Sequence, residues 1–345
     1  MDTITESCVY AGMNGYGGYA PLLQDLLKEC GLVFILKGTP GCGKSTLMKR
    51  LCARAERTGK ECAVIRCSAD TNSLDAVIFP ELGIAVADGT APHVLEPALP
   101  LVDGVIIDLT GEYTKEFRSS YGERLRSLDG AKKKAYAEAY SMLGAAGRID
   151  EAMKRSAKWA TDAQKLKSFA ERTVRKYAKE RGNAEFVPCA CFNGNGSSLS
   201  PPARIKKLTV VKDFYSLSGA LLKAMAETCA KENKAHTVIP SPVDPDVPCG
   251  VILGENAFVS DRYFVPAGEA AVNTRRFADK ELYSRVKARL AFCERLYREL
   301  LARAAQYMRE AAGYHGSIEK IYSLASDYSK ADKAYIMLCE SIFGE

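Results

Sequence analysis

The sequence predicts an α/β protein of two units, each a mostly parallel sheet followed by a helical hairpin or tail. Its 345 residues exceed the roughly 150 of one typical domain. Short apolar runs alternate with amphipathic helical patterns, as expected for parallel strands joined by crossover helices. The same order of elements recurs after a shift of about 175 residues, which is why two units are expected rather than one.

The composition is that of an ordinary globular protein, with 47% hydrophobic and 26% charged residues. No run approaches the about 18 apolar residues that a membrane span needs. Residues 1–12 have neither the basic start nor the apolar core of a signal peptide. We therefore expect a cytoplasmic protein without a membrane span. Its 12 cysteines are then expected to be free thiols rather than a disulfide framework.

The strongest local signal follows the apolar run 33–37, which is typical of a buried parallel strand. The next eight residues, 38–45, fit the phosphate-binding pattern G-x-x-x-x-G-K-[ST], and residues 46–55 continue as an amphipathic helix. Strand, loop and helix thus stand in the order that the pattern requires. The expected phosphate contacts are Gly38, Thr39, Pro40, Gly41, Cys42, Gly43, Lys44, Ser45 and Thr46.

This loop predicts a site for a nucleoside triphosphate and Mg²⁺. Its glycines allow backbone torsions that side chains forbid, and its N–H groups with the helix start attract a phosphate. Lys44 would reach the β- and γ-oxygens, and the Ser45 hydroxyl would bind Mg²⁺. The Asn-Lys-x-Asp loop typical of guanine binding is missing, because Asn233-Lys234 is followed by Ala and His. We therefore expect ATP rather than GTP.

A second metal ligand is expected at the end of another strand. The run 84–87 ends in Asp88, and the run 105–107 ends in Asp108. An acid at the carboxyl end of a strand beside the phosphate loop holds Mg²⁺ directly or through water. We rank Asp88 first and Asp108 second.

The group that would activate water is less well defined. Many ATPases place a glutamate directly after this acid, but here Gly89 follows Asp88. Glu81 and His93 are the nearest polar candidates for a catalytic role, and Asp70 is a further one. Each could equally be a hydrogen-bonding residue in a turn, because geometry must be met before a pKa matters.

The recurring pattern predicts a tandem duplication whose second copy has lost its phosphate loop. The expected domains are 1–182, with a helical tail at about 113–182, and 186–345, with a helical tail at about 276–342. In the second copy the shift places Gly219 at the lysine position, and Asp213 would repel a triphosphate. A structural or regulatory role is expected for this copy.

The basic charge is concentrated in one segment. Residues 113–182 hold 18 Lys or Arg against 9 Asp or Glu, whereas the net charge of the whole chain is only +6. Such a segment would dock nucleic acid or an anionic protein, although solvated helix faces produce the same excess more often. Association into a homo-oligomer is a further expectation that the sequence leaves open.

The first copy resembles a bacterial family of tandem P-loop ATPases. The resemblance rests on residues 35–48 (ILKGTPGCGKSTLM), 67–75, 79–85 and 88–93 (DGTAPH). It implies ATP binding and hydrolysis to ADP and phosphate, but no other substrate. Members often carry a P-loop in both copies, and this chain departs from that pattern. The alternatives left open are a small-molecule kinase using the same loop and a non-hydrolysing nucleotide-binding module that docks a partner through its basic helices.

Overall fold

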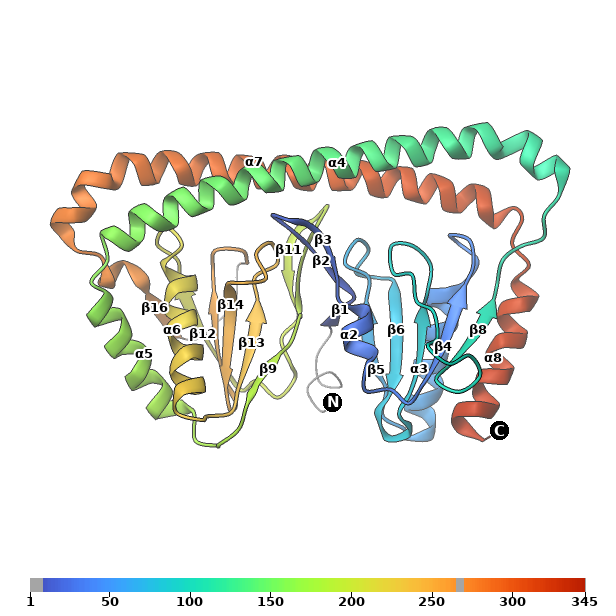
Figure 1. Cartoon of the computed structure of the whole chain (residues 1–345), viewed down its shortest axis with the longest axis horizontal. Helices are drawn as coiled ribbons and strands as arrows, with labels where there is room; N and C mark the ends of the chain where they lie inside the picture. Colours follow the sequence, from blue (N-terminus) through green and yellow to red (C-terminus); the bar gives the residue numbers. More distant parts are fainter. Residues whose placement is uncertain (1–8, 265–269, 345) are drawn as a thin grey trace. The chain divides into compact units, whose positions relative to one another are not determined.

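The computed structural model describes residues 9–264 and 270–344, which form two compact units (Figure 1). Of the described residues, the first unit contains 9–12, 20–138 and 307–344, and the second contains 13–19, 139–264 and 270–306. Each unit has an α/β architecture around one mixed six-stranded sheet. The predicted fold class is therefore confirmed.

The sheet of the first unit has the strand order β1-β5-β6-β7-β4-β8. Parallel pairing joins β1 to β5, and β4 to both β7 and β8, whereas β6 is antiparallel to its two neighbours. The strand β6, with Asp75 as its second residue, was not predicted from the sequence. The strands are β1 (Val9–Tyr10), β4 (Leu32–Lys37), β5 (Ala63–Arg66), β6 (Leu74–Phe79), β7 (Ile84–Asp88) and β8 (Gly104–Asp108).

Helices from both ends of the chain complete the first unit. The helix predicted after the phosphate loop is α3 (Lys44–Thr58), which ends at Gly59 in the left-handed conformation (φ +68°). Its apolar face packs into one core with the sheet and with α8 (Tyr328–Phe343). The unit also contains α2 (Leu23–Leu27) and the 3₁₀ turn η1 (Pro80–Leu82). Buried residues of α3 and α8 in this core are Leu47, Met48, Leu51, Ala55, Ala331, Ala334, Leu338 and Ile342.

The second unit has the strand order β9-β13-β14-β15-β12-β16 when its sheet is followed from β9. Parallel and antiparallel pairings follow one another as in the first sheet. This identical order is what a duplication would produce, and the duplication itself stays a prediction. The strands are β9 (Ala184–Phe186), β12 (Lys207–Lys212), β13 (His236–Pro240), β14 (Pro248–Leu253), β15 (Asn256–Ser260) and β16 (Ala270–Asn273).

The second unit also contains helices and hairpins, although residues 12, 20 and 21 of the first hairpin belong to the first unit. The segment 188–202 contains a hairpin, and a similar hairpin lies near the start of the chain. The apolar face of α5 packs with α6 over the sheet. The elements are β2 (Gly12–Gly15), β3 (Gly18–Pro21), β10 (Ala190–Asn193), β11 (Gly196–Leu199), α5 (Ala163–Tyr177), α6 (Leu217–Lys231) and the 3₁₀ turn η2 (Thr274–Phe277).

The helical tails predicted over 113–182 and 276–342 are present, but each begins with one very long helix. These are α4 (Lys115–Trp159) and α7 (Lys280–Ser323). The first unit includes α4 up to residue 138 and α7 from residue 307, and the second unit includes the rest of both helices. The compact units therefore differ from the ranges 1–182 and 186–345, which stay a prediction about the repeat.

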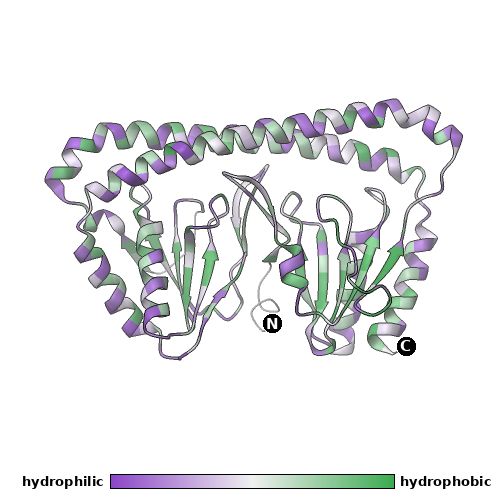
Figure 2. Ribbon diagram, viewed as in Figure 1, coloured by the Kyte–Doolittle hydropathy of each residue, from purple (hydrophilic) through white to green (hydrophobic). Residues whose placement is uncertain are grey.

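Hydropathy differs between the strands and the long helices. In Figure 2 the strands are mostly green, whereas the long helices alternate between green and purple along their length. Buried strands must be apolar on both faces, whereas a surface helix needs only one apolar stripe. Among the helices that the structure describes, none is both long enough and apolar enough to cross a membrane.

Candidate functional site

The phosphate loop lies between the end of β4 and the start of α3, where the pattern predicted it. Gly41 and Gly43 have φ values of +78° and +99°, in a region that L side chains rarely adopt. A Cβ atom on Gly38 would lie 2.5 Å from Cys42 Sγ. Gly43 caps α3 without a side chain, so no cap side chain accepts from the first N–H groups of the helix, which are the groups that bind anions at a helix start.

The Lys44 side chain is buried and folds back over this loop. Its ammonium donates to the carbonyl oxygens of Gly38 (3.0 Å) and Thr39 (3.2 Å). The same nitrogen lies 3.7 Å from Asp88 Oδ2. A positive charge is therefore held within the loop, with a carboxylate next to it.

Asp88 ends β7, which lies directly beside the P-loop strand with Asp88 paired to Leu36. Its Oδ1 accepts from the main-chain N–H (2.9 Å) and the hydroxyl (2.6 Å) of Thr90. Burial raises the pKa of this carboxyl, although Lys44 and Thr90 oppose the shift. Asp108 ends β8 on the other side of β4, but it is exposed and accepts from Thr110. Of the two acids, Asp88 is the one beside Lys44.

Ser45 and Asp88 are the predicted Mg²⁺ ligands, and the side chains of both carry oxygen atoms of the kind that could hold this ion. The Ser45 hydroxyl accepts from the main-chain N–H of Leu74 at 3.0 Å, so its oxygen is fixed at the start of α3. Within the described residues no group of three or more His, Cys, Asp or Glu side chains gathers as a metal site. Mg²⁺ needs no such cage, because it usually keeps several waters and binds through one or two protein ligands plus substrate phosphates.

A buried acid and a histidine lie at the same edge of the sheet. His93 Nε2 is 3.1 Å from Asp75 Oδ2, and both side chains are buried. The oxygen is nevertheless without a hydrogen bond to any part of the chain that the structure describes. In addition to burial, the charge of Asp75 raises the pKa of Asp88. Sequence reasoning identified His93 but missed Asp75, which stands inside the otherwise apolar β6.

The other two acidic candidates do not join this group. Glu81 lies in η1 after the far end of β6, next to the start of β7, whereas the P-loop is at the opposite edge of the sheet. Its position therefore gives no support to the catalytic role predicted for it. Asp70 lies at the correct edge but is exposed, and its carboxylate accepts from Asn72 in a turn.

The C-terminal helices of the chain contact the P-loop, which the sequence did not predict. The Tyr328 hydroxyl donates to the Gly41 carbonyl oxygen at 3.3 Å. A Cβ atom on Gly41 would lie 3.1 Å from the Glu319 carbonyl oxygen. Burial lowers the pKa of His315, Glu319 opposes this shift, and nearby Lys132 and Lys44 add to it. The sequence predicted a helical tail over 276–342 but contained no information about which part of the chain it would contact.

The second unit has a shorter turn at the position of the P-loop. Four residues connect β12 to α6, whereas six connect β4 to α3. The cap residue is Ser216, whose φ of +68° resembles the conformation of Gly43. When the two helix starts are aligned, Leu217 rather than Gly219 takes the position of Lys44, because the turn is two residues shorter.

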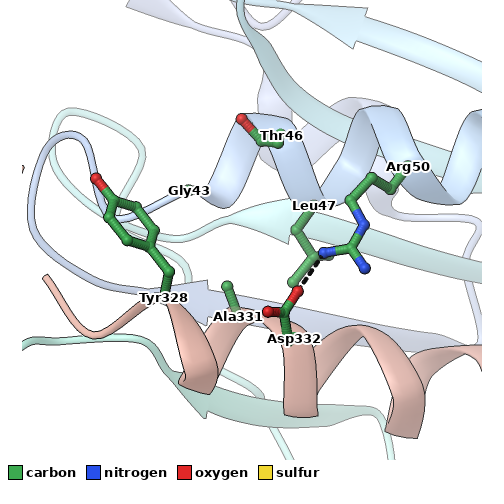
Figure 3. A pocket seen from close by; sticks show the side chains of 7 residues that line it. All are labelled: Gly43, Thr46, Leu47, Arg50, Tyr328, Ala331 and Asp332. Carbon is green, nitrogen blue, oxygen red and sulfur yellow. Dashed lines mark hydrogen bonds and ion pairs between the residues drawn. The ribbon is translucent and has the colours of Figure 1, made fainter.

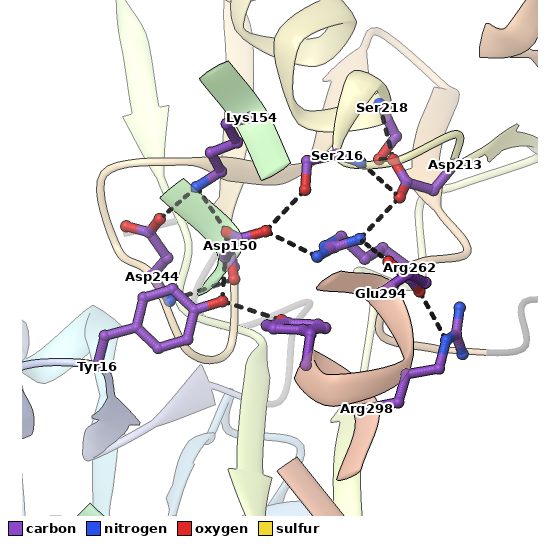
Figure 4. Close-up of polar contacts among 12 residues, drawn as sticks. Tyr16, Asp150, Lys154, Asp213, Ser216, Ser218, Asp244, Arg262, Glu294 and Arg298 are labelled. Carbon is purple, nitrogen blue, oxygen red and sulfur yellow. Dashed lines mark hydrogen bonds and ion pairs between the residues drawn. The ribbon is translucent and has the colours of Figure 1, made fainter. Parts of the chain in front are cut away.

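A carboxylate of the protein occupies the helix N-terminus in this second turn (Figure 4). Asp213 accepts from the main-chain N–H groups of Ser216 and Ser218, each at 2.9 Å. Arg262 donates to the same carboxylate at 2.9 Å, and also to Asp150 at 2.7 Å. The groups that bind a phosphate in a P-loop are thus already paired with an internal anion.

The comparison with protein-family models matches residues 33–91 to the AAA domain (dynein-related subfamily). The matched segment contains β4, the phosphate loop, α3 and the strands up to Asp88. This similarity supports a P-loop ATPase at the general level. Neither the curated proteins nor the solved structures include a match. The resemblance to a tandem family stays a prediction.

Proposed function

We propose that the first unit binds ATP with Mg²⁺ at the P-loop and hydrolyses it to ADP and phosphate. The observation that carries this proposal is the placement of Lys44, whose buried ammonium lies inside the loop and 3.7 Å from Asp88. Buried charges are costly unless they are paired. A lysine and an acid held together at the end of two parallel strands are therefore better explained by a ligand than by stability.

Each part of the site has a defined task in this proposal. The main-chain N–H groups of residues 38–46, other than Pro40, bind the phosphate oxygens, and Lys44 exchanges its two carbonyl acceptors for the β- and γ-phosphates. Ser45 and Asp88 hold the metal. When bound, Mg²⁺ neutralises charge that develops on the phosphates. The Asp75–His93 pair is the candidate acceptor for the proton of the attacking water, since both side chains are buried at this edge.

Phosphate release from ATP by the purified chain tests the proposal. Lys44→Ala should lower the rate by about 10²-fold or more, since losing one donor to transition-state charge typically costs that much. Lys49→Ala is the matched control, because Lys49 lies exposed on the same helix and should retain full activity. His93→Gln and Asp75→Asn test the two members of the proposed pair one at a time. Only one of these two substitutions should remove the base that accepts the proton.

The same assay distinguishes the alternatives. Phosphate that appears only on an added acceptor would identify a small-molecule kinase. Binding of ATP without any turnover would identify a nucleotide-binding module. ATP affinity unchanged in Lys44→Ala would refute the site itself.

We further propose that the second unit binds no nucleotide and has a structural or regulatory role. The Asp213 carboxylate supports this, because it already accepts the N–H groups at the start of α6. The expected stoichiometry, measured by calorimetry, is one ATP per chain, and Lys44→Ala should remove it entirely. Two ATP molecules per chain would contradict this assignment.

A further inference from the structure

A cavity of about 210 Å³ lies beside the first turn of α3, between this helix and α8 (Figure 3). Both helices belong to the first unit. The cavity is smaller than the about 300–1,000 Å³ of pockets for drug-sized ligands. It therefore suits one ring system better than a whole nucleotide. The residues that line it are Gly43, Thr46, Leu47, Arg50, Tyr328, Ala331 and Asp332.

The position of the cavity relates it to the P-loop. Gly43 and Thr46 belong to the nine residues expected to hold the phosphates, and they also line the cavity. The N–H groups of such a loop surround the α- and β-phosphates. The ribose and base continue from the α-phosphate, so a cavity that shares walls with the loop lies within their reach.

One wall is an aromatic ring. Tyr328 is the first residue of α8 and is 49% exposed, so one face of its ring is available to a ligand. Its hydroxyl is fixed on the Gly41 carbonyl at 3.3 Å. A Cβ atom on Gly43 would lie 3.8 Å from the Tyr328 ring, so the ring stands directly against the P-loop. Aromatic side chains stack on the faces of nucleobases.

The opposite wall is polar. Arg50 and Asp332 form an ion pair of 2.6 Å, and the Arg50 guanidinium also lies 4.0 Å from the centre of the Tyr335 ring. In Figure 3 Tyr328 stands on one side, this ion pair on the other, and the small Ala331 side chain lies between them. The rim thus offers both a donor and an acceptor to the edge of a base.

We propose that this cavity holds the nucleobase of the bound nucleotide, with the base stacked on Tyr328. The proposal rests on the proposed function and deepens it, because it assigns half of the nucleotide site to a helix about 280 residues after the P-loop. The phosphates are held by residues 38–46, and the base by α8.

The test compares ATP with inorganic tripolyphosphate, which has the phosphates without the base. Calorimetry should show that the wild-type chain binds ATP about tenfold or more tightly than tripolyphosphate, in keeping with the contribution of one base stacked on an aromatic side chain. Tyr328→Leu should lower ATP affinity about tenfold and leave tripolyphosphate affinity unchanged. Tyr328→Phe keeps the ring and should bind ATP within about threefold of wild type.

A second variant changes another residue that lines the cavity. The longer side chain of Ala331→Met would fill the cavity, and this substitution should weaken the binding of ATP but not the binding of tripolyphosphate. Unchanged tripolyphosphate binding shows in each variant that the loop and α8 are folded. Ile336→Ala, at an exposed position of α8, is the control and should change neither affinity.

The outcomes separate this inference from the proposed function. A wild-type chain that binds neither ligand would refute the proposed function. Equal affinity for ATP and tripolyphosphate, or an unchanged ratio in both Tyr328→Leu and Ala331→Met, would refute the base site alone.

Discussion

Replacing Arg262 with methionine should destabilise the second unit more than any substitution of an exposed arginine. The Arg262 side chain is 3% exposed and contacts three carboxylates, those of Asp150, Asp213 and Glu294, at 2.7, 2.9 and 3.3 Å. Methionine fills much of the same space without the charge. The acids would then lie buried or half-buried, without their shared cation.

The magnitude follows from the cost of leaving buried charges unpaired. Removal of one partner from a buried ion pair costs about 3–5 kcal/mol. In domains of about 150–250 residues, each kcal/mol lowers the melting temperature by about 2–4 °C. The melting temperature of the second unit should therefore fall by about 6–20 °C.

Hydrogen exchange of the full-length chain, measured by mass spectrometry, localises the effect. Peptides from α6 and β15 should exchange much faster in Arg262→Met, whereas peptides from α3 and β7 in the first unit provide an internal reference. Arg298→Met is the matched control, because Arg298 pairs with the same Glu294 at 2.6 Å but is 68% exposed. An exposed pair contributes only about 0–1 kcal/mol. Equal destabilisation by the two variants would refute the reasoning.

Three further predictions concern Asp88, the pair Cys52 and Cys62, and Asp150. Asp88→Asn should lower ATP hydrolysis by about 10²-fold or more, because it removes a ligand of the proposed Mg²⁺ and with it part of the stabilisation of transition-state charge. Phosphate release at the wild-type rate would contradict this. The Cys52 and Cys62 sulfurs lie 3.1 Å apart, and their hydrogen bond lowers the pKa of Cys52. Diamide should therefore join them, with a mass loss of two hydrogens that Cys62→Ser abolishes. Burial alone would raise the Asp150 pKa, but its cationic neighbours hold this pKa below the ordinary value. Ionised Asp150 therefore stabilises the folded chain in full above about pH 4, the pKa of an unfolded aspartate. This contribution declines as the pH falls through the lower pKa of the folded state. Denaturant melts of Asp150→Asn should lack this part of the acid dependence.

The fold class and the phosphate loop could be predicted because each is encoded by residues that lie close together in the sequence. The strand before the loop, the glycines at 41 and 43 and the Lys44-Ser45 pair are encoded within a dozen residues. Asp88 follows the same logic, since an acid that ends a short apolar run marks the carboxyl end of a strand.

Contacts between residues that lie far apart in the sequence could not be predicted. Nothing in residues 74–79 indicates that Asp75 lies near His93, because the antiparallel insertion of β6 sets that contact. Glu81 seemed close in sequence, yet the direction of β6 carries it to the other edge of the sheet. Pairing of α8 with α3 could not be predicted either, because an apolar stripe specifies burial but not a partner.

The pairing of α3 with α8 has a consequence for the order in which the chain becomes native during synthesis. After Thr58, where α3 ends, the ribosome must add 270 residues to reach Tyr328, where α8 starts; at 5–20 residues per second this takes about 15–50 s. During this interval the apolar face of α3 lacks Ala331, Ala334, Leu338 and Ile342. The first unit to emerge is therefore the last to be completed. A nascent chain stalled before residue 328 should therefore lack both the packing of α8 on α3 and the contact of Tyr328 with Gly41.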